Sequence, residues 1–196
     1  GMTRMPLVLK TVEQFFGKLG HRHDRTEVDL SLSAANNRLE GTQTLPVSFF
    51  DDVTQAYTYP DVNTNQLLML ALKGRHFIAN DTVLGGNVFV RRFRNVNLSS
   101  NVNNGFGTVD PITGLTDDVQ AVIDRAVIEQ TSAGFGAQLT LQRELGGMRN
   151  QLVLGGGGDF GRATYTQESQ PAALTESRGT VATGAFETET FAQTRS

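Results

Sequence analysis

The chain of 196 residues is long enough for one sizeable domain and short for two. Its net charge of −3 and pI near 5.6 argue against nucleic acid or an anionic membrane surface as a partner. The absence of cysteine excludes disulfides, thiolate metal sites and cysteine nucleophiles. The sequence contains no apolar run of about 18 residues, which excludes a transmembrane helix.

Residues 1–22 form an N-terminal segment in which the spacing of apolar residues predicts a short helix. One helical face would carry Val8, Val12, Phe15, Phe16 and Leu19. The apolar run Met5–Leu9 is too short for the core of a signal peptide. We therefore expect this chain to lack an export signal of its own and to be a piece of something longer.

Strict alternation of apolar and polar residues follows the N-terminal segment, first in Thr26–Ala34 and again in Gly134–Leu145. A period of two over that many residues predicts a sheet with one apolar and one polar face. In the strand near 65–78, Lys73 and Arg75 mark the polar face. The predicted apolar face carries Val28, Leu30, Leu32, Leu68, Leu70, Leu72, Phe135, Ala137, Leu139 and Leu141.

About six strands are predicted, joined by connections that alternate between long and short. The strands are expected near 25–35, 65–78, 83–94, 132–145, 151–165 and 181–194. The long connections are 36–64, 95–131 and 166–180, and Asp117–Ile128 is expected to form one or two helical turns. Long loops at one end and short turns at the other are typical of an outer-membrane barrel. The prediction is an all-β fold in which 23–196 form an antiparallel up-and-down meander, part of a larger transmembrane β-barrel.

Several stretches resemble TonB-dependent outer-membrane receptors, and the resemblance covers most of the chain from Phe16 onward. The clearest similarity is in Gly134–Leu141, which continues to Arg149–Leu152 and Gly155. Further similar segments are Asp24–Leu32, Leu45–Val47, Tyr57–Asp61 with Asn65, Gly86–Arg94 and Leu174–Gly179.

The resemblance implies a 22-stranded barrel closed by a plug domain, which takes up ferric siderophores, cobalamin or other scarce nutrients. A TonB-type energy-coupling protein would act through the plug. Neither the plug nor its energy-coupling box is present, and about six strands are too few to close such a pore. The chain is expected to be a fragment of an outer-membrane active-transport receptor for a scarce nutrient, most plausibly a ferric siderophore. The alternative is a soluble or surface-exposed β-sheet binding domain without transport activity.

Residue groups that could bind a metal ion or a phosphate were considered, and none is predicted to form a site. His21, His23 and Asp24 are interpreted as an exposed strand start, because no fourth metal ligand is suitably spaced. The run Gly155–Gly158 lacks the lysine of a phosphate-binding loop and is interpreted as a bend or close backbone approach. The acidic pairs Asp51/Asp52 and Asp117/Asp118 lack the ligand spacing of a calcium loop. No enzyme, cofactor or metal is expected, since no catalytic arrangement is recognised.

The long loops are the expected place for ligand contact, because loops carry recognition where a scaffold fixes the wall. The candidate aromatic contacts are Phe49, Phe50, Tyr57, Tyr59 and Phe106. For the two tyrosines a membrane-interface girdle is an equally good interpretation. Arg91, Arg92 and Arg94 either attract an anionic ferric complex or form a charged rim, and the rim is favoured. The excised sheet is expected to close into a small barrel, to pair its edges with a second copy, or to need detergent.

Overall fold

The computed structural model describes residues 10–41, 47–52 and 57–196. One short 3-10 helix and eight strands make up its regular structure. In chain order these are β1 (Lys10–His23), β2 (Thr26–Glu40), η1 (Val47–Asp52), β3 (Val62–Ala79), β4 (Thr82–Val102), β5 (Ala121–Leu145), β6 (Met148–Leu174), β7 (Thr180–Ala182) and β8 (Glu187–Arg195).

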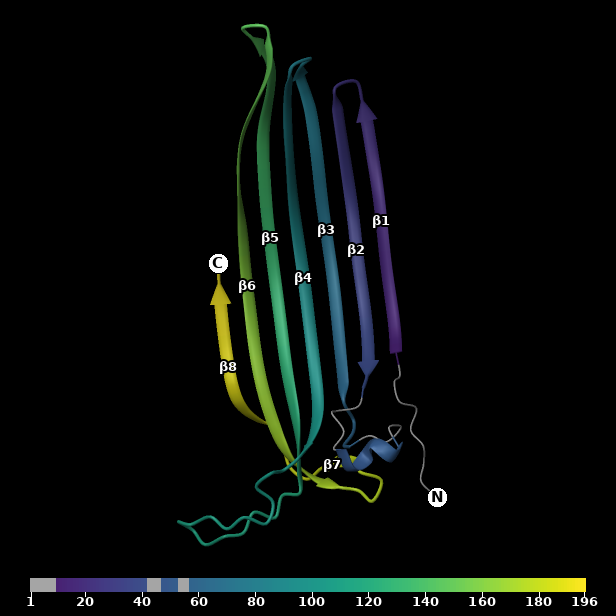
Figure 1. Cartoon of the computed structure of the whole chain (residues 1–196), viewed down its shortest axis with the longest axis vertical. Coiled ribbons are helices and arrows are strands. Elements are labelled where there is room, and N and C mark those ends of the chain that lie inside the picture. The colour runs from purple at the N-terminus through teal and green to yellow at the C-terminus, as the bar shows by residue number, and fades with distance from the viewer. Residues whose placement is uncertain (1–9, 42–46, 53–56) are drawn as a thin grey trace.

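The strands form one antiparallel sheet in which each strand pairs with the next along the chain. β7 and β8 both pair with β6, at different heights. The tight turns after β1, β3 and β5 lie together at one end of the sheet, and the longer connections lie at the other (Figure 1). We call these the turn end and the loop end. The predicted up-and-down meander with alternating connections is confirmed.

The predicted N-terminal helix is wrong wherever the structure describes it, because Lys10–His23 is strand β1. β1 pairs with β2 along its whole length, from Lys10 opposite Leu39 to His23 opposite Thr26. This ladder places Phe15 and Leu19 on one face, and Val12 and Phe16 on the other. Val8 and the rest of 1–9 lie outside the described residues.

The strands extend further toward the loop end than predicted, which shortens all three long connections. β2 ends at Glu40 and β3 begins at Val62, so the first connection is 41–61. β4 continues to Val102 and β5 begins at Ala121, so the longest predicted loop shrinks to 103–120. The helical turns expected in Asp117–Ile128 are absent, since 121–128 belong to β5. β6 reaches Leu174, which leaves 175–179 as its connection to β7. The predicted sixth strand is divided into β7 and β8.

The register confirms the predicted division into two faces. Residues directly opposite each other on neighbouring strands project to the same side of a sheet. Leu30 pairs with Leu72, Leu72 with Val88, and Val88 with Phe135, which places these side chains on one face. The same ladders place all ten predicted apolar residues on that face. Gln138 lies on the other face and pairs with Gly85.

The sheet is open, with β1 at one edge and β6 with β8 at the other (Figure 1). Of the three expected outcomes for the excised sheet, closure into a small barrel is therefore not the one seen. Among the described residues, no strand pairs with the outer side of β1, and none pairs with the outer side of β6 over 148–160, where β5 is its partner on the inner side. No helix in the described ranges has the length and apolarity needed to cross a bilayer.

A small hydrophobic core lies at the loop end of the sheet. Ala121 and Ile123 of β5 and Ala172 of β6 are buried, and Leu98, Leu174 and Phe186 pack against them. The guanidinium of Arg125 lies 4.2 Å from the centre of the Phe186 ring and forms an ion pair with Glu168. At this end the chain's own loops cover the same face that is bare further along the strands.

Candidate functional site

An apolar surface crosses the middle of one face, and we call it the apolar belt. Most of its side chains are exposed, including Phe15, Leu68, Phe135 and Phe160. It comprises Phe15, Leu19, Val28, Leu30, Leu32, Ala34, Leu68, Leu70, Leu72, Leu84, Val88, Val90, Ala133, Phe135, Ala137, Leu139, Leu141, Leu152, Leu154 and Phe160. A bare apolar surface of this extent marks contact with a partner or a membrane.

The apolar belt runs obliquely across the strands. On β2 it begins at Ala34 and ends at Val28, whereas on β5 it begins at Ala133 and ends at Leu141. Residues aligned across neighbouring strands form a row. The row of Ala34 reaches β5 at Thr131, which is closer to the loop end than Ala133. The row of Val28 reaches β5 at Ala137, and Leu141 lies further toward the turn end. Both borders therefore shift toward the turn end from β2 to β5, as they would if the strands tilted against a flat apolar layer.

The opposite face, which we call the polar face, carries many paired charges, although Val12, Phe16 and Val153 are also exposed on it. Glu27 accepts hydrogen bonds from Arg75 at 2.7 Å and has Arg22 at 3.8 Å, while Lys18 lies 3.1 Å from Asp29. Nearer the loop end an amide cluster crosses β3 and β4. Its members are Asn63, Asn65 and Asn95, joined by side-chain hydrogen bonds of 2.6–3.1 Å. This face presents donors and acceptors of both signs.

The three arginines of β4 are divided between the two faces. Arg91 projects from the polar face, opposite Ser132. Arg92 and Arg94 lie on the other face, just beyond the loop-end border of the apolar belt, where Arg94 pairs with Glu129 at 3.2 Å. The interpretation as a charged rim fits Arg92 and Arg94. On the polar face, Arg91 Nε and Ser132 Oγ are buried without a hydrogen-bond partner, so an anionic group brought there would find two unused polar atoms.

Three hydroxyl side chains, which we call the hydroxyl cluster, fasten two loops to β4. They are Thr58, Ser100 and Thr180, and the first two are 1% and 0% exposed. Thr58 donates to the Ser100 carbonyl, and Ser100 Oγ lies 2.8 Å from both the Pro60 carbonyl oxygen and Thr180 Oγ1. The Thr180 backbone N–H donates to the Tyr59 carbonyl at 2.9 Å. The segments around 58–60 and 177–180 thereby form one layer over the loop end.

The predicted aromatic contacts are distributed unequally. Tyr59 lies against the backbone of Gly179, with its hydroxyl 2.8 Å from Ser177, so it helps to build the loop layer. The Arg178 guanidinium lies 5.2 Å from the centre of the Tyr57 ring. Phe106 is half-exposed on the separate loop 103–120. The side chains of Phe49 and Phe50 lie outside the described residues. Among the described candidates, Tyr57 and Tyr59 are the two that contact the segment 177–179.

Residues 103–120 form a narrow finger that projects beyond the loop end (Figure 1). Asn103 closes its base by donating to Asp117 at 2.9 Å and to the Val119 carbonyl at 2.8 Å. An isolated bridge between Val109 and Thr116 holds its two sides together. The tip presents apolar side chains to solvent, with Ile112 93% and Leu115 72% exposed. Since backbone and side-chain hydrogen bonds fix the finger, its apolar tip is a preorganised contact surface.

Asp110 stabilises the turn at the finger tip and gives it a predicted pH dependence. Its carboxylate accepts from the backbone N–H groups of Ile112 at 2.7 Å and Thr113 at 3.2 Å. These bonds lower the pKa of Asp110 below its ordinary value. A depressed pKa in the folded turn means that the stabilisation is present above the unfolded pKa, about 3.9, and is lost as the pH falls through the folded pKa.

We expect amide exchange at Ile112 and Thr113 to become faster below about pH 4, relative to the intrinsic rates. Asp110→Asn should show fast exchange at these two amides already at neutral pH, with little further change on acidification. Amide exchange measured by NMR at several pH values tests this. Equal pH profiles in the wild type and the variant would contradict it.

The residues considered for metal or phosphate binding form no site. His23 Nε2 lies 3.4 Å from Asp24, and the His21 and His23 rings stack at 6.4 Å. Within the described ranges, no group of three or more potential metal ligands is found. Gly155 and Gly157 pass so close to the β5 backbone that an added Cβ would lie 2.9 Å and 2.5 Å from its carbonyl oxygens. The interpretation as a close backbone approach is confirmed for these two positions.

The hydroxyl cluster was missed by the sequence predictions. Its members are separated by 42 and 80 residues along the chain, and each is an ordinary serine or threonine in a polar stretch. The one feature of the sequence near these residues that points to such contacts is the length of the loops, since long loops need side-chain hydrogen bonds to hold them against the sheet. Comparison with protein-family models, curated proteins and solved structures gives no match to this chain.

Proposed function

We propose that this sheet is part of the wall of a transmembrane β-barrel in an outer membrane, within an active-transport receptor for a scarce nutrient. The observation that carries the proposal is the oblique apolar belt on one face of an antiparallel meander. In that arrangement the belt faces lipid and the polar face lines the lumen. The recognition loops lie together at one end of the strands.

The height of the apolar belt supports this placement. On β5 it runs from Ala133 to Leu141, and on β6 from Leu152 to Phe160. Eight steps of roughly 3.3 Å give about 26 Å along the strand, or about 20 Å along the normal at a tilt near 40°. Side chains at each border bring this close to the apolar band of a membrane barrel, roughly 25 Å tall. The borders are polar, with Arg143 and Asn150 at the turn end of these two strands.

The identity of the cargo rests on the resemblance to TonB-dependent receptors, which points to a ferric siderophore. The plug and the TonB-type partner enter the proposal through the same resemblance. Further strands of the parent barrel would pair with the outer edges of β1 and β6. On the lumen face, the unpartnered atoms of Arg91 and Ser132 suit an anionic cargo. At the loop end, the finger and the loop layer would contact that cargo first.

The alternative is a soluble or surface-exposed binding domain, in which other protein would have to cover the apolar belt. In water the belt would leave a large apolar surface exposed, together with two open strand edges. A soluble domain would have to cover both, for example by pairing with a second copy. Lipid covers the belt without any further protein.

Flotation with vesicles separates these two possibilities. The chain is diluted from urea into buffer alone, into detergent and into phosphatidylcholine vesicles, and is then centrifuged in a density gradient. We expect it to float with the vesicles with a strand-type circular dichroism spectrum, to stay dispersed in detergent, and to aggregate in buffer alone. A chain that stays soluble in buffer as a monomer or dimer and does not float would overturn the membrane placement and favour the binding domain.

A further inference from the structure

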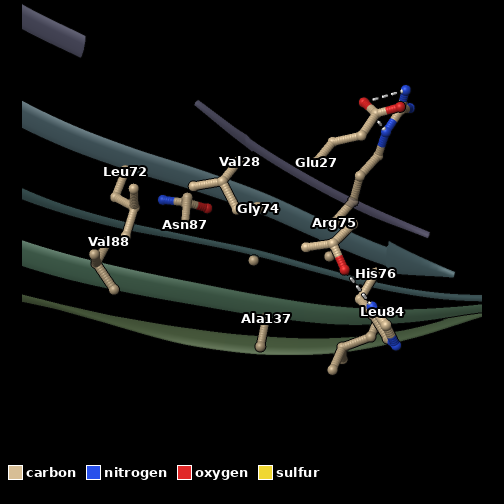
Figure 2. Close-up of a pocket in the computed structure, with 13 residues that line it drawn as sticks. Glu27, Val28, Leu72, Gly74, Arg75, His76, Leu84, Asn87, Val88 and Ala137 are labelled. Atoms are coloured by element: carbon tan, nitrogen blue, oxygen red, sulfur yellow. Dashed lines mark hydrogen bonds and ion pairs between the residues drawn. The ribbon is translucent and has the colours of Figure 1, made fainter. Parts of the chain in front are cut away.

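A hollow of about 400 Å³ interrupts the apolar belt near its turn-end border (Figure 2). Its floor is the cross-strand pair Gly74 and Gly86, which has no side chains to fill the surface. In the same row, Val28 on β2 and Ala137 on β5 flank the two glycines. The register thus places a gap in an otherwise continuous ridge of side chains.

Leu72 and Val88 close the hollow toward the loop end, and His76 and Leu84 close it toward the turn end (Figure 2). Three polar lining residues, Glu27, Arg75 and Asn87, alternate to the opposite face of the sheet. On this face the polar side chains of the lining are those of Thr26 and His76, and both lie at the turn-end rim. There His76 Nδ1 lies 2.8 Å from the hydroxyl of Thr26. When Nδ1 accepts the Thr26 proton, Nε2 carries the hydrogen and can donate it to an anionic oxygen.

We infer that this hollow holds one acyl chain of a phospholipid, with the headgroup at the His76 rim. The inference rests on the proposed membrane placement. A water molecule in the apolar part would lack polar partners, and an empty hollow would forfeit van der Waals contacts along its lining. A hydrocarbon chain with a single polar end matches apolar walls that carry one polar rim. The volume lies at the lower end of the range for small-molecule sites.

Gly74→Val tests the inference by filling the floor. A Cβ at Gly74 would have its nearest neighbour at 3.7 Å, the Glu27 carbonyl oxygen, and valine is well suited to a strand. Gly156→Val is the matched control. Gly156 lies in the same row on β6, pairs with Ala137, and has open space above it.

The wild type and both variants are inserted into phosphatidylcholine vesicles that contain a small fraction of phosphatidylcholine with a photoreactive acyl chain. After irradiation, mass spectrometry locates the adducts at residue level. We expect labelling along the whole apolar belt, with an excess at Val28, Leu72 and Val88. The excess should disappear in Gly74→Val and persist in Gly156→Val.

The remaining belt residues report on correct insertion in each variant. Even labelling of the belt in the wild type would overturn the lipid site and leave the proposed function standing. An equal loss of the excess in both variants would overturn the lipid site as well. Absence of labelling over the whole belt would instead remove the membrane placement on which the inference rests.

Discussion

Replacing Leu30 with arginine is expected to destabilise the membrane-inserted chain by about 2–4 kcal/mol, the cost of an arginine on a lipid-facing strand near the bilayer midplane. Leu30 lies within the apolar belt, between Leu19 on β1 and Leu72 on β3. Its neighbours offer no acceptor for a guanidinium. The long side chain would have to reach past apolar rows to a polar border.

Ser33→Arg is the matched control for this substitution. Ser33 lies on the same strand but on the polar face, between Phe16 and Met69. In the proposed barrel an arginine there would extend into an aqueous lumen and cost little. Urea titration of the vesicle-inserted proteins compares the two variants. Equal destabilisation by both arginines would mean that the apolar belt does not face lipid.

The two faces of the sheet could be predicted because the strands alternate strictly within the apolar belt. When the two faces of a sheet meet different surroundings, one apolar and one aqueous, successive residues must differ in polarity. The segment Val28–Ala34 shows this alternation directly. The tight turns after β3 and β5 were equally predictable. Asn80-Asp81 and Gly146-Gly147 are turn-forming pairs, and both glycines adopt positive φ.

β1 could not be predicted, because its apolar residues satisfy two periods at once. Val12, Phe15, Phe16 and Leu19 have helical spacing, yet as a strand they divide between the two faces. Pairing with β2 decides the outcome, since all 14 residues of β1 lie in register with β2 and every second one exchanges backbone hydrogen bonds with it. Local spacing carries no information about such a long-range ladder.

The strand extensions toward the loop end were missed for a different reason. Beyond the apolar belt the alternation of apolar and polar residues fades, as in Ala121–Ile128 of β5. These rows are held by the backbone ladder and by cross-strand pairs such as Arg94 with Glu129 and Asn101 with Asp124. Polar pairs of this kind are specific in space but have no signature along one strand.

The long connections lie together at one end of the sheet, as predicted, but their organisation depends on contacts that no local pattern records. Tyr57 and Tyr59 were expected as ligand or interface residues, whereas Tyr59 also stabilises the turn at Gly179. Segments around 58–60 and 177–180 are far apart in the chain and meet because the four strands β3 to β6 bring the chain back to the same end. The arrangement of the two loop segments therefore depends on the hydroxyls that hold this layer in place.

Ser100→Ala is expected to destabilise this loop layer by about 1–3 kcal/mol, because it leaves buried polar partners unsatisfied. Ser100 Oγ is the one atom of the cluster within 2.8 Å of both the Pro60 carbonyl oxygen and the Thr180 hydroxyl. Its loss should loosen 57–61 and 175–180 together while the strands toward the turn end remain intact. Amide exchange in both segments should accelerate roughly tenfold, which corresponds to about 1.4 kcal/mol.

Ser99→Ala provides the control, since Ser99 is the neighbouring serine on the opposite face of β4, across from Asp124. Hydrogen exchange followed by mass spectrometry should show both loops exchanging faster in Ser100→Ala and unchanged in Ser99→Ala. Acceleration of only one loop would mean that the two are fastened independently. Since a preorganised surface loses less entropy on binding, joint loosening would also predict weaker capture of the cargo by the parent receptor.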